Sequence, residues 1–241
     1  MITKWWITGD CHGDFSRFYK MNDIATELKE IWGVIVLGDS SVNYWLSNRD
    51  NHVKDSLRNK YPNIIFYLVR GNHEARPESL KNIKTLQDDN VKGEVYIQDR
   101  WPNIRYFIDG NEYCINNKKC LVIGGAYSVD KWYRLERGVM GGYSGWFHDE
   151  QLSQEERDKI LEKCRGRHYD AILAHTCPLR YQPRDLFLSC VKQDGVDNSM
   201  ELWLEDVIEV CSWDKFIFGH YHDDRIIDEK VEMMFHGIKE F

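Results

Sequence analysis

The sequence predicts an α/β fold, and two patterns carry that prediction. Short, nearly continuous apolar runs recur along the chain, as in strands that are buried on both faces. Helical patterns lie between several of these runs, so strands and helices alternate. No internal repeat, low-complexity tract or linker rich in proline or serine interrupts the 241 residues. We therefore expect one domain over residues 1–241.

Six apolar runs are the expected strands, and most of them end at a glycine or a polar cluster. In chain order they are Trp5–Thr8, Val34–Leu37, Ile64–Val69, Leu121–Ile123, Ala171–Ala174 and Lys215–Phe218.

Two stretches are expected to be helical. Residues 15–32 carry apolar side chains at roughly 3.6-residue spacing, which is typical of an amphipathic helix. Residues 151–164 predict a charged helix that begins near Ser153. Ser153 and Glu156 fit a capping box, in which each side chain accepts a hydrogen bond from the backbone of the other residue.

The composition indicates a packed globular protein. Hydrophobic residues make up 42% of the chain, and the formal net charge is −7, which argues against an extended basic surface for nucleic acid. The seven cysteines are scattered without a C-x-x-C pair, which favours reduced thiols. The sequence shows neither a signal peptide nor an apolar segment long enough to cross a bilayer. We expect a cytoplasmic protein that binds no membrane.

Side chains suited to metal binding follow the expected strands. Asp10 and His12 are two residues apart, as are His220 and His222, and side chains at that spacing in an extended segment point to the same side. Carboxylate, imidazole and amide ligands together suit Mn²⁺, Fe or Zn²⁺, and the absence of thiolates disfavours a structural zinc site. The full set is Asp10, His12, Asp39, Asn72, His73, His175, His220 and His222.

Five short motifs together resemble the ordered blocks of the calcineurin-like metallophosphoesterases. They are G-D-C-H-G at 9–13, G-D at 38–39, G-N-H-E at 71–74, A-H at 174–175 and G-H-Y-H at 219–222. One motif alone is weak, because a glycine–aspartate pair is common in turns. All five in the right order, each directly after an apolar run, are a strong signal. The resemblance implies a four-layer sandwich of two packed β-sheets flanked by helices.

The resemblance also implies the ligands of a dinuclear metal centre. Two divalent ions are expected, with Mn²⁺ the first choice and Fe, Zn²⁺, Ni²⁺ or Co²⁺ as alternatives. Asp39 would bridge the two ions. The remaining ligands would be Asp10, His12 and His222 at the first ion, and Asn72, His175 and His220 at the second.

The implied reaction is the hydrolysis of a phosphoester, by a phosphatase or a phosphodiesterase. Two divalent cations lower the pKa of a bridging water, and the resulting hydroxide attacks phosphorus. His73 would act as the general acid that protonates the leaving alkoxide. Arg70 resembles an arginine that contacts phosphate. The expected partners are phosphorylated small molecules or nucleotides, and the oligomeric state is left open.

Two other functions are compatible with the same motifs. A nuclease of this fold is not favoured, because the chain is acidic and has no basic stripe interleaved with aromatic residues. The second is a non-catalytic module that binds phosphate or a partner, although every expected metal ligand is present. Asp14 could orient a ligand histidine or cap a helix, and residues 124–128 could form a loop near the site or a tight turn. We expect residues 40–60, 127–150 and 178–212 to select the substrate.

Overall fold

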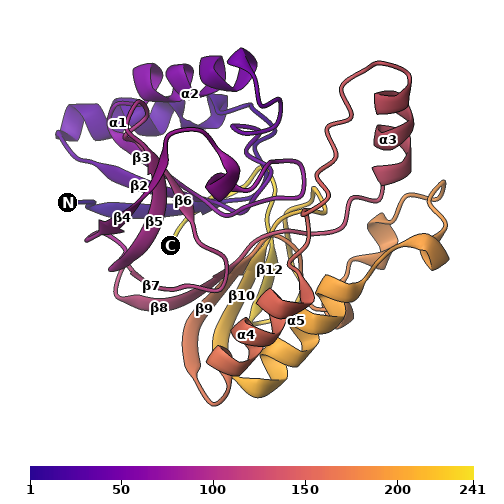
Figure 1. The fold of residues 1–241 in the computed structure, drawn as a ribbon. Helices are drawn as coiled ribbons and strands as arrows, with labels where there is room; N and C mark the ends of the chain where they lie inside the picture. The colour runs from indigo at the N-terminus through magenta and orange to yellow at the C-terminus, as the bar shows by residue number, and fades with distance from the viewer.

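Two mixed β-sheets form the centre of the protein in the computed structural model, which describes residues 1–241 (Figure 1). The first sheet has seven strands in the order β13-β1-β2-β3-β6-β5-β4, and the second has six in the order β11-β12-β10-β9-β8-β7. The strands are β1 Lys4–Thr8, β2 Trp32–Val36, β3 Ile64–Leu68, β4 Ile83–Asp88, β5 Gly93–Gln98, β6 Ile104–Phe107, β7 Glu112–Ile115, β8 Lys118–Ile123, β9 His168–Ala174, β10 Ser212–Phe218, β11 Arg225–Ile226, β12 Val231–Met233 and β13 Ile238–Glu240.

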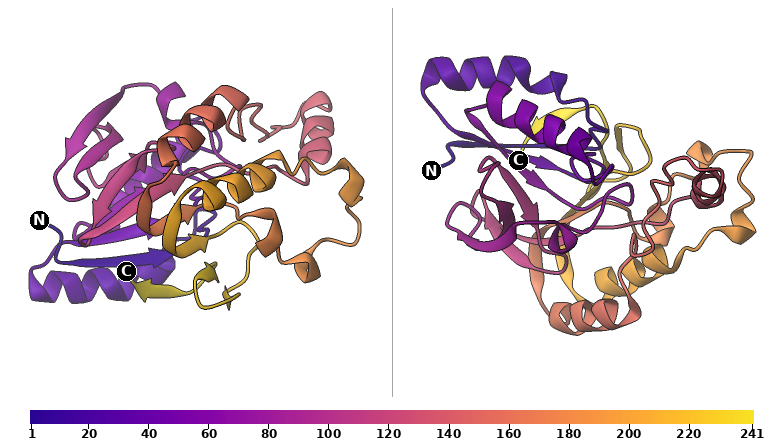
Figure 2. Two further views of the ribbon diagram at one scale, coloured as in Figure 1. Left: turned by 90° about the horizontal axis from the view of Figure 1, so that it is seen from below. Right: turned by 45° about the horizontal axis from the view of Figure 1, so that its top comes forward.

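Four of the five α-helices cover the outer faces of the sheets. Helices α1 and α2 lie together over the first sheet and α4 and α5 over the second, whereas α3 stands apart from both (Figures 1 and 2). The α-helices are α1 Tyr19–Leu28, α2 Asn48–Lys60, α3 Lys131–Val139, α4 Gln154–Cys164 and α5 Ser199–Val210. The 3-10 helices are Ser16–Phe18, Pro77–Ser79, Leu179–Tyr181, Arg184–Leu186 and Gln193–Gly195.

The buried apolar side chains form three clusters, one for each interface between layers. The cluster between the sheets includes Ile35 of β2 and Leu173 of β9. Leu57 of α2 belongs to the cluster under the first pair of helices, and Ile160 and Leu204 to the cluster under α4 and α5. Burying apolar area at these three interfaces holds the layers together. The expected four-layer sandwich is confirmed.

Parallel strands at the centre of each sheet position the functional loops. In the first sheet β2 pairs in parallel with β1 and with β3, and in the second β9 pairs in parallel with β8 and with β10. The carboxyl ends of parallel neighbours lie at one edge of a sheet, which is where ligands bind in α/β proteins. All six expected strands are present, although Leu37 and Val69 lie just beyond the ends of β2 and β3.

The first expected helix is shorter than residues 15–32. A 3-10 turn precedes α1, which ends at Leu28, and Lys29 adopts a left-handed conformation with φ 57°. The backbone N–H of Glu30 then donates to the carbonyl of Ala25, which closes the helix in a Schellman-like turn. Ile31 lies in the connection and Trp32 already begins β2, so neither belongs to the helix. Apolar periodicity alone does not separate the end of a helix from the strand that follows it.

The second expected helix is confirmed as α4. Its capping box is present, with the Ser153 hydroxyl accepting from the backbone of Glu156 and the Glu156 carboxylate accepting from the backbone of Ser153. All seven cysteines are free thiols. None of the helices combines the length and apolar character that crossing a bilayer requires.

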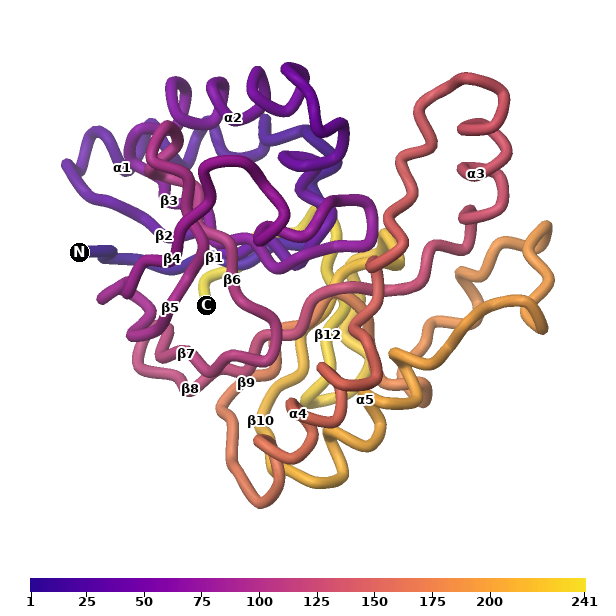
Figure 3. Tube along the Cα trace, viewed as in Figure 1, coloured from indigo at the N-terminus to yellow at the C-terminus, as the bar shows by residue number.

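Three long connections contain helices of their own. Residues 40–60 end in α2, residues 127–150 form an arm that carries α3, and residues 178–212 form a loop that leads into α5. We refer to residues 127–150 as the arm and to residues 178–198 as the loop. The chain trace shows both projecting on the same side of the molecule (Figure 3).

Candidate metal centre

All the residues predicted to bind metal follow strands of the two sheets. Four come from the first sheet and three from the second, so the site lies where the carboxyl ends of the two sheets meet. They are Asp10 and His12 after β1, Asp39 after β2, Asn72 after β3, His175 after β9, and His220 and His222 after β10.

The loops after β1 and β2 are tied to each other through their backbones. The N–H groups of Cys11 and His12 both donate to the carbonyl of Asp39, at 3.3 and 2.7 Å. His12, Asp39, His220 and His222 have φ values of 47°, 44°, 71° and 57°. Positive φ is uncommon outside glycine and gathers at functional sites, where the surrounding structure maintains the strain. These loops are therefore held in shapes that bring the ligands together.

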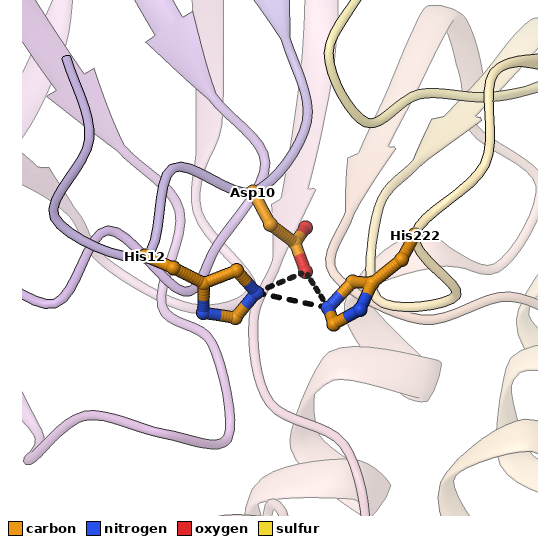
Figure 4. A group of neighbouring side chains, drawn as sticks. All are labelled: Asp10, His12 and His222. Atoms are coloured by element: carbon orange, nitrogen blue, oxygen red, sulfur yellow. Dashed lines mark hydrogen bonds and ion pairs between the residues drawn. The ribbon is translucent and has the colours of Figure 1, made fainter.

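The first cluster consists of Asp10, His12 and His222 (Figure 4). The Oδ2 atom of Asp10 lies 3.3 Å from Nε2 of His222 and 3.7 Å from Nε2 of His12, and the two Nε2 atoms are 2.9 Å apart. This Oδ2 is buried and has no hydrogen-bonding partner. A buried carboxylate oxygen without a hydrogen bond is costly unless a cation compensates for its charge. The arrangement fits a metal ion shared by the three side chains.

The second cluster brings two hydrogen-bond acceptors face to face. Nδ1 of His175 donates to the carbonyl of Leu37 at 2.7 Å, which leaves Nε2 as the acceptor of a neutral ring. That Nε2 lies 2.8 Å from Oδ1 of Asn72. The Asn72 amide nitrogen donates to the Ser128 hydroxyl, which donates to the carboxylate of Glu150. The orientation of Asn72 is thereby set. Two acceptors this close need a proton or a metal cation between them.

Asp39 lies between the two clusters. Its Oδ1 is 3.7 Å from Nε2 of His175, and it groups with Asp10 and His175 in a second potential metal site. Burial opposes ionisation of Asp39, but the facing His73, His175 and His12 more than compensate, and its pKa is lowered. Asp39 is therefore an ionised carboxylate that faces both clusters.

His220 completes the predicted ligand set. Its ring centroid lies 5.0 Å from that of His175, and its backbone N–H donates to Oδ1 of Asp10 at 3.0 Å. The donor set as a whole consists of buried carboxylates, an amide oxygen and imidazole nitrogens, which is the chemistry that Mn²⁺, Fe and Zn²⁺ accept. The residues present fit two divalent metal ions.

His73 lies at the rim of the metal centre, beside an arginine. Its side chain is 19% exposed, and its Nε2 accepts a hydrogen bond from Nη2 of Arg134 at 3.3 Å. Burial lowers the pKa of His73 against the influence of Asp39, and the positive charge of Arg134 lowers it further. Asp130 and Tyr44 hold the Arg134 guanidinium at 2.7 and 2.9 Å.

The sequence offers Arg134 as one of four arginines in the long connections, with Arg137, Arg180 and Arg184, that could meet additional phosphates, but it does not place Arg134 beside His73. Its only sequence signal is its position in one of the long connections expected to select the substrate. In the structure Arg134 of α3 reaches the general-acid candidate His73.

Arg70, which we expect to contact phosphate, is buried and bound to other residues of the protein. It is 3% exposed, its Nε donates to Asp109 at 2.9 Å, and its Nη1 donates to the carbonyl of Glu150 at 2.8 Å. The backbone N–H of Gly125 donates to the Arg70 carbonyl. Arg70 therefore fastens the end of β3 to the arm, while its buried Nη2 has no hydrogen-bonding partner, and its contact with phosphate stays a prediction. The motif around Arg70 does not reveal that its side chain binds Asp109 and Glu150.

Glu74 has a structural role that the sequence did not indicate. Its carboxylate accepts hydrogen bonds from the backbone N–H groups of Ser40 and Gly71, at 3.1 and 3.2 Å, and from the Ser40 hydroxyl at 2.7 Å. It thereby joins the loop that carries Asp39 to the loop that carries Asn72.

Two interpretations left open by the sequence are decided by contacts. Oδ1 of Asp14 accepts from the backbone N–H of Ser16 at 2.9 Å, so Asp14 caps the turn before α1. Residues 124–128 lie at the site, because Ser128 binds Asn72.

A cavity of about 290 Å³ adjoins the metal centre. Its other walls come from the arm and the loop, which are two of the three connections expected to select the substrate. The metal end of the cavity is lined by Asp39, Asn72, His73, His220 and His222.

The sequence matches the model of a family described as calcineurin-like phosphoesterase over residues 3–229. No curated protein matches the chain. Among solved structures, a phosphopantetheinyl hydrolase from Mycobacterium tuberculosis is 15% identical, with a TM-score of 0.40 over 96% of this chain and 88% of that one. A protein serine/threonine phosphatase from Saccharomyces cerevisiae is 16% identical, with a TM-score of 0.33 over 96% of this chain and 66% of that one. Because the family match spans nearly the whole chain and the metal-ligand candidates gather at one site, the protein belongs to the calcineurin-like phosphoesterase family.

Proposed function

We propose that this protein is a phosphoester hydrolase that depends on two divalent metal ions and acts on phosphorylated small molecules or nucleotides. The observation that carries the proposal is the pair of facing acceptors, Nε2 of His175 and Oδ1 of Asn72, 2.8 Å apart. The Oδ2 atom of Asp10, buried without a hydrogen bond, supports it at the neighbouring cluster. Family membership supports the class of reaction.

In this proposal each cluster holds one ion. The first is bound by Asp10, His12 and His222 and the second by Asn72, His175 and His220, with Asp39 contacting both. Mn²⁺ is our first choice, and Fe, Zn²⁺, Ni²⁺ and Co²⁺ suit the same mixture of oxygen and nitrogen ligands. Bound ions of this kind lower the pKa of a water to give a nucleophile near neutral pH and neutralise phosphate charge.

The residues at the rim supply the remaining chemistry. His73 faces the cavity, and in its protonated imidazolium form it would donate a proton to the oxygen of the leaving alcohol. The Arg134 guanidinium, already oriented by Asp130 and Tyr44, would donate hydrogen bonds to a phosphate oxygen. No specific observation favours a nuclease or a non-catalytic module over this function.

A combined measurement of metal content and turnover tests the proposal. Protein stripped of metal and reloaded with each candidate ion should bind two ions per chain and hydrolyse an alkyl phosphate or its diester. His73→Ala should retain the metal ions but lose about 10²-fold or more in kcat on the alkyl phosphate. It should lose less on p-nitrophenyl phosphate, because that leaving group barely needs a proton.

His148→Ala is the matched control, because the His148 side chain is 87% exposed and lies outside the cavity lining. Less than one ion per chain together with no hydrolysis would contradict the proposal and favour a binding module. Unchanged turnover of His73→Ala on the alkyl phosphate would remove His73 as the acid.

A further inference from the structure

The cavity beside the metal centre has two chemically different ends. One end is lined by the metal-ligand candidates and by His73, where a phosphate would be bound. The other end is lined by residues of the arm and the loop. A phosphoester with its phosphate at the metals would therefore extend its organic group between the arm and the loop.

The far end of the cavity is mostly apolar. Tyr127 and Val129 line it from the arm, and Phe187, Leu188 and Val191 line it from the loop. Leu188 is 57% exposed and Val129 is 41% exposed, so apolar surface there faces water. Binding sites are usually built in this way, with apolar walls that lose contact with water when the ligand binds.

The aromatic side chains at this end favour a flat group. Phe187 stacks on Tyr221, with ring centroids 6.4 Å apart and planes inclined by 20°. Both rings line the cavity, and aromatic faces pack well against other planar groups. An apolar cavity of about 150 Å³ accommodates benzene. The roughly 290 Å³ here therefore has room for one ring beside a phosphate.

The charges around the cavity disfavour a second anionic group. No lysine or arginine is among the lining residues, whereas Asp130 and Glu201 are. The arginine that touches the lining, Arg134, lies at His73 and so at the phosphate end. A further phosphate or a carboxylate at the far end would find no lysine or arginine among the lining residues to pair with.

We infer that this cavity selects phosphoesters with a single phosphate and an uncharged, flat, apolar organic group, and that Phe187 is a specificity-determining residue. The inference rests on the proposed function and names the class of substrate for the same site. The phosphate lies at the metal end beside Arg134, and the organic group packs between Phe187 of the loop and Val129 of the arm.

Three alkyl phosphates with closely similar leaving groups test this inference on the metal-loaded protein. 2-Phenylethyl phosphate should have a kcat/KM about tenfold or more above that of ethyl phosphate, because its ring buries apolar surface in the cavity. 2-Carboxyethyl phosphate should have a kcat/KM below that of ethyl phosphate, because its carboxylate meets no cation. A 2-phenylethyl phosphate that is no better than ethyl phosphate, or a carboxyethyl ester that is the best of the three, would overturn the inference.

The variant Phe187→Ala separates packing against the ring from the general chemistry of the site. It should lower the ratio of the kcat/KM values for 2-phenylethyl and ethyl phosphate by about fivefold or more. Ile226→Ala removes a side chain that is 75% exposed and outside the cavity, and should leave this ratio unchanged. An unchanged ratio in Phe187→Ala would overturn its role. Failure to hydrolyse any of the three esters would instead reject the proposed function, and the inference with it.

Discussion

Asn72 presents its oxygen to the metal centre because its amide nitrogen is already engaged. That nitrogen donates to the Ser128 hydroxyl at 2.8 Å, and the same hydroxyl donates to Glu150. Partners that orient a metal ligand typically change metal affinity about 10- to 100-fold when they are removed. Ser128→Ala should therefore weaken binding of one metal ion by about tenfold, measured by metal titration of the stripped protein.

Ser144→Ala is the control for this prediction. It lies on the same arm and its hydroxyl has no hydrogen-bonding partner, so its removal should leave metal affinity unchanged. Equal affinities in the Ser128 and Ser144 variants would show that Asn72 is oriented by something other than Ser128.

Because of Lys54, the stability of the protein should change with pH in the alkaline range. It is 3% exposed in α2, donates to the side-chain carbonyl of Gln98 and lies 4.9 Å from the centroid of the Trp101 ring. Burial lowers its pKa from 10.5 to about 8, although Asp50 and Glu74 oppose the shift. The neutral form is thus favoured by folding. Its contribution to stability is present above pH 10.5 and is lost as the pH falls through about 8.

Replacing Lys54 by Met should therefore stabilise the folded protein more at neutral than at alkaline pH. The free energy of unfolding of Lys54→Met minus that of the wild type, measured in urea, should be more positive at pH 7 than at pH 9.5. Subtracting the wild type cancels every other group that titrates in both proteins. A difference that is independent of pH would show that Lys54 keeps an ordinary pKa in the folded protein.

At the scale of single elements, the loops that follow the strands depend on close backbone contacts. A Cβ atom at Gly71 would overlap both the side chain and the backbone nitrogen of Asp39. Gly71→Ala should push the loop after β3 away from the loop after β2, and cost about 1–3 kcal/mol in the free energy of unfolding. The same displacement should lower metal content, because Asp39 and Asn72 move apart.

Gly195→Ala is the matched control, because its Cβ would meet nothing within 4 Å and its φ is not in the left-handed range. Urea unfolding and metal analysis of both variants check the prediction. Normal metal content in Gly71→Ala would mean that the two loops tolerate separation.

Elements whose ends are marked by local sequence signals were predictable. Elements whose ends or positions depend on contacts with distant parts of the chain were less predictable. The capping box of α4 involves two residues three positions apart, so the sequence contains all of it. The end of α1 at Leu28 was not apparent, because Ile31 continues the apolar spacing beyond it and Trp32 then begins β2. The helix α3 has no buried residue, and its position depends on contacts such as that of Arg134 with Tyr44.

At the scale of the whole molecule, the metal centre joins the two sheets. The ligand candidates after β1, β2 and β3 belong to the first sheet, and those after β9 and β10 belong to the second. Ions that bind only the folded protein stabilise it, by about 2.7 kcal/mol when their concentration is 100 times the Kd. Removing them should also leave buried carboxylates facing one another without a counter-charge.

Removal of metal with a chelator should therefore lower the melting temperature, and added Mn²⁺ should restore it in a concentration-dependent way. His222→Ala should reduce the shift, whereas His148→Ala should behave as the wild type does. Identical melting temperatures with and without metal would contradict binding at the junction of the sheets. Differential scanning calorimetry on each of the three proteins, with and without metal, provides the measurement.

The sequence by itself determined the fold class and the predicted metal ligands. Both depend on short segments. In each segment an apolar run forms a buried strand, and the polar residues directly after it lie at the edge of the sheet. Only the tertiary structure decided that Arg70 turns inward to Asp109, that Arg134 reaches His73, and that the arm and the loop enclose one cavity. These are contacts between residues up to about a hundred positions apart. Side-chain direction and long-range packing set them, and no local pattern encodes either.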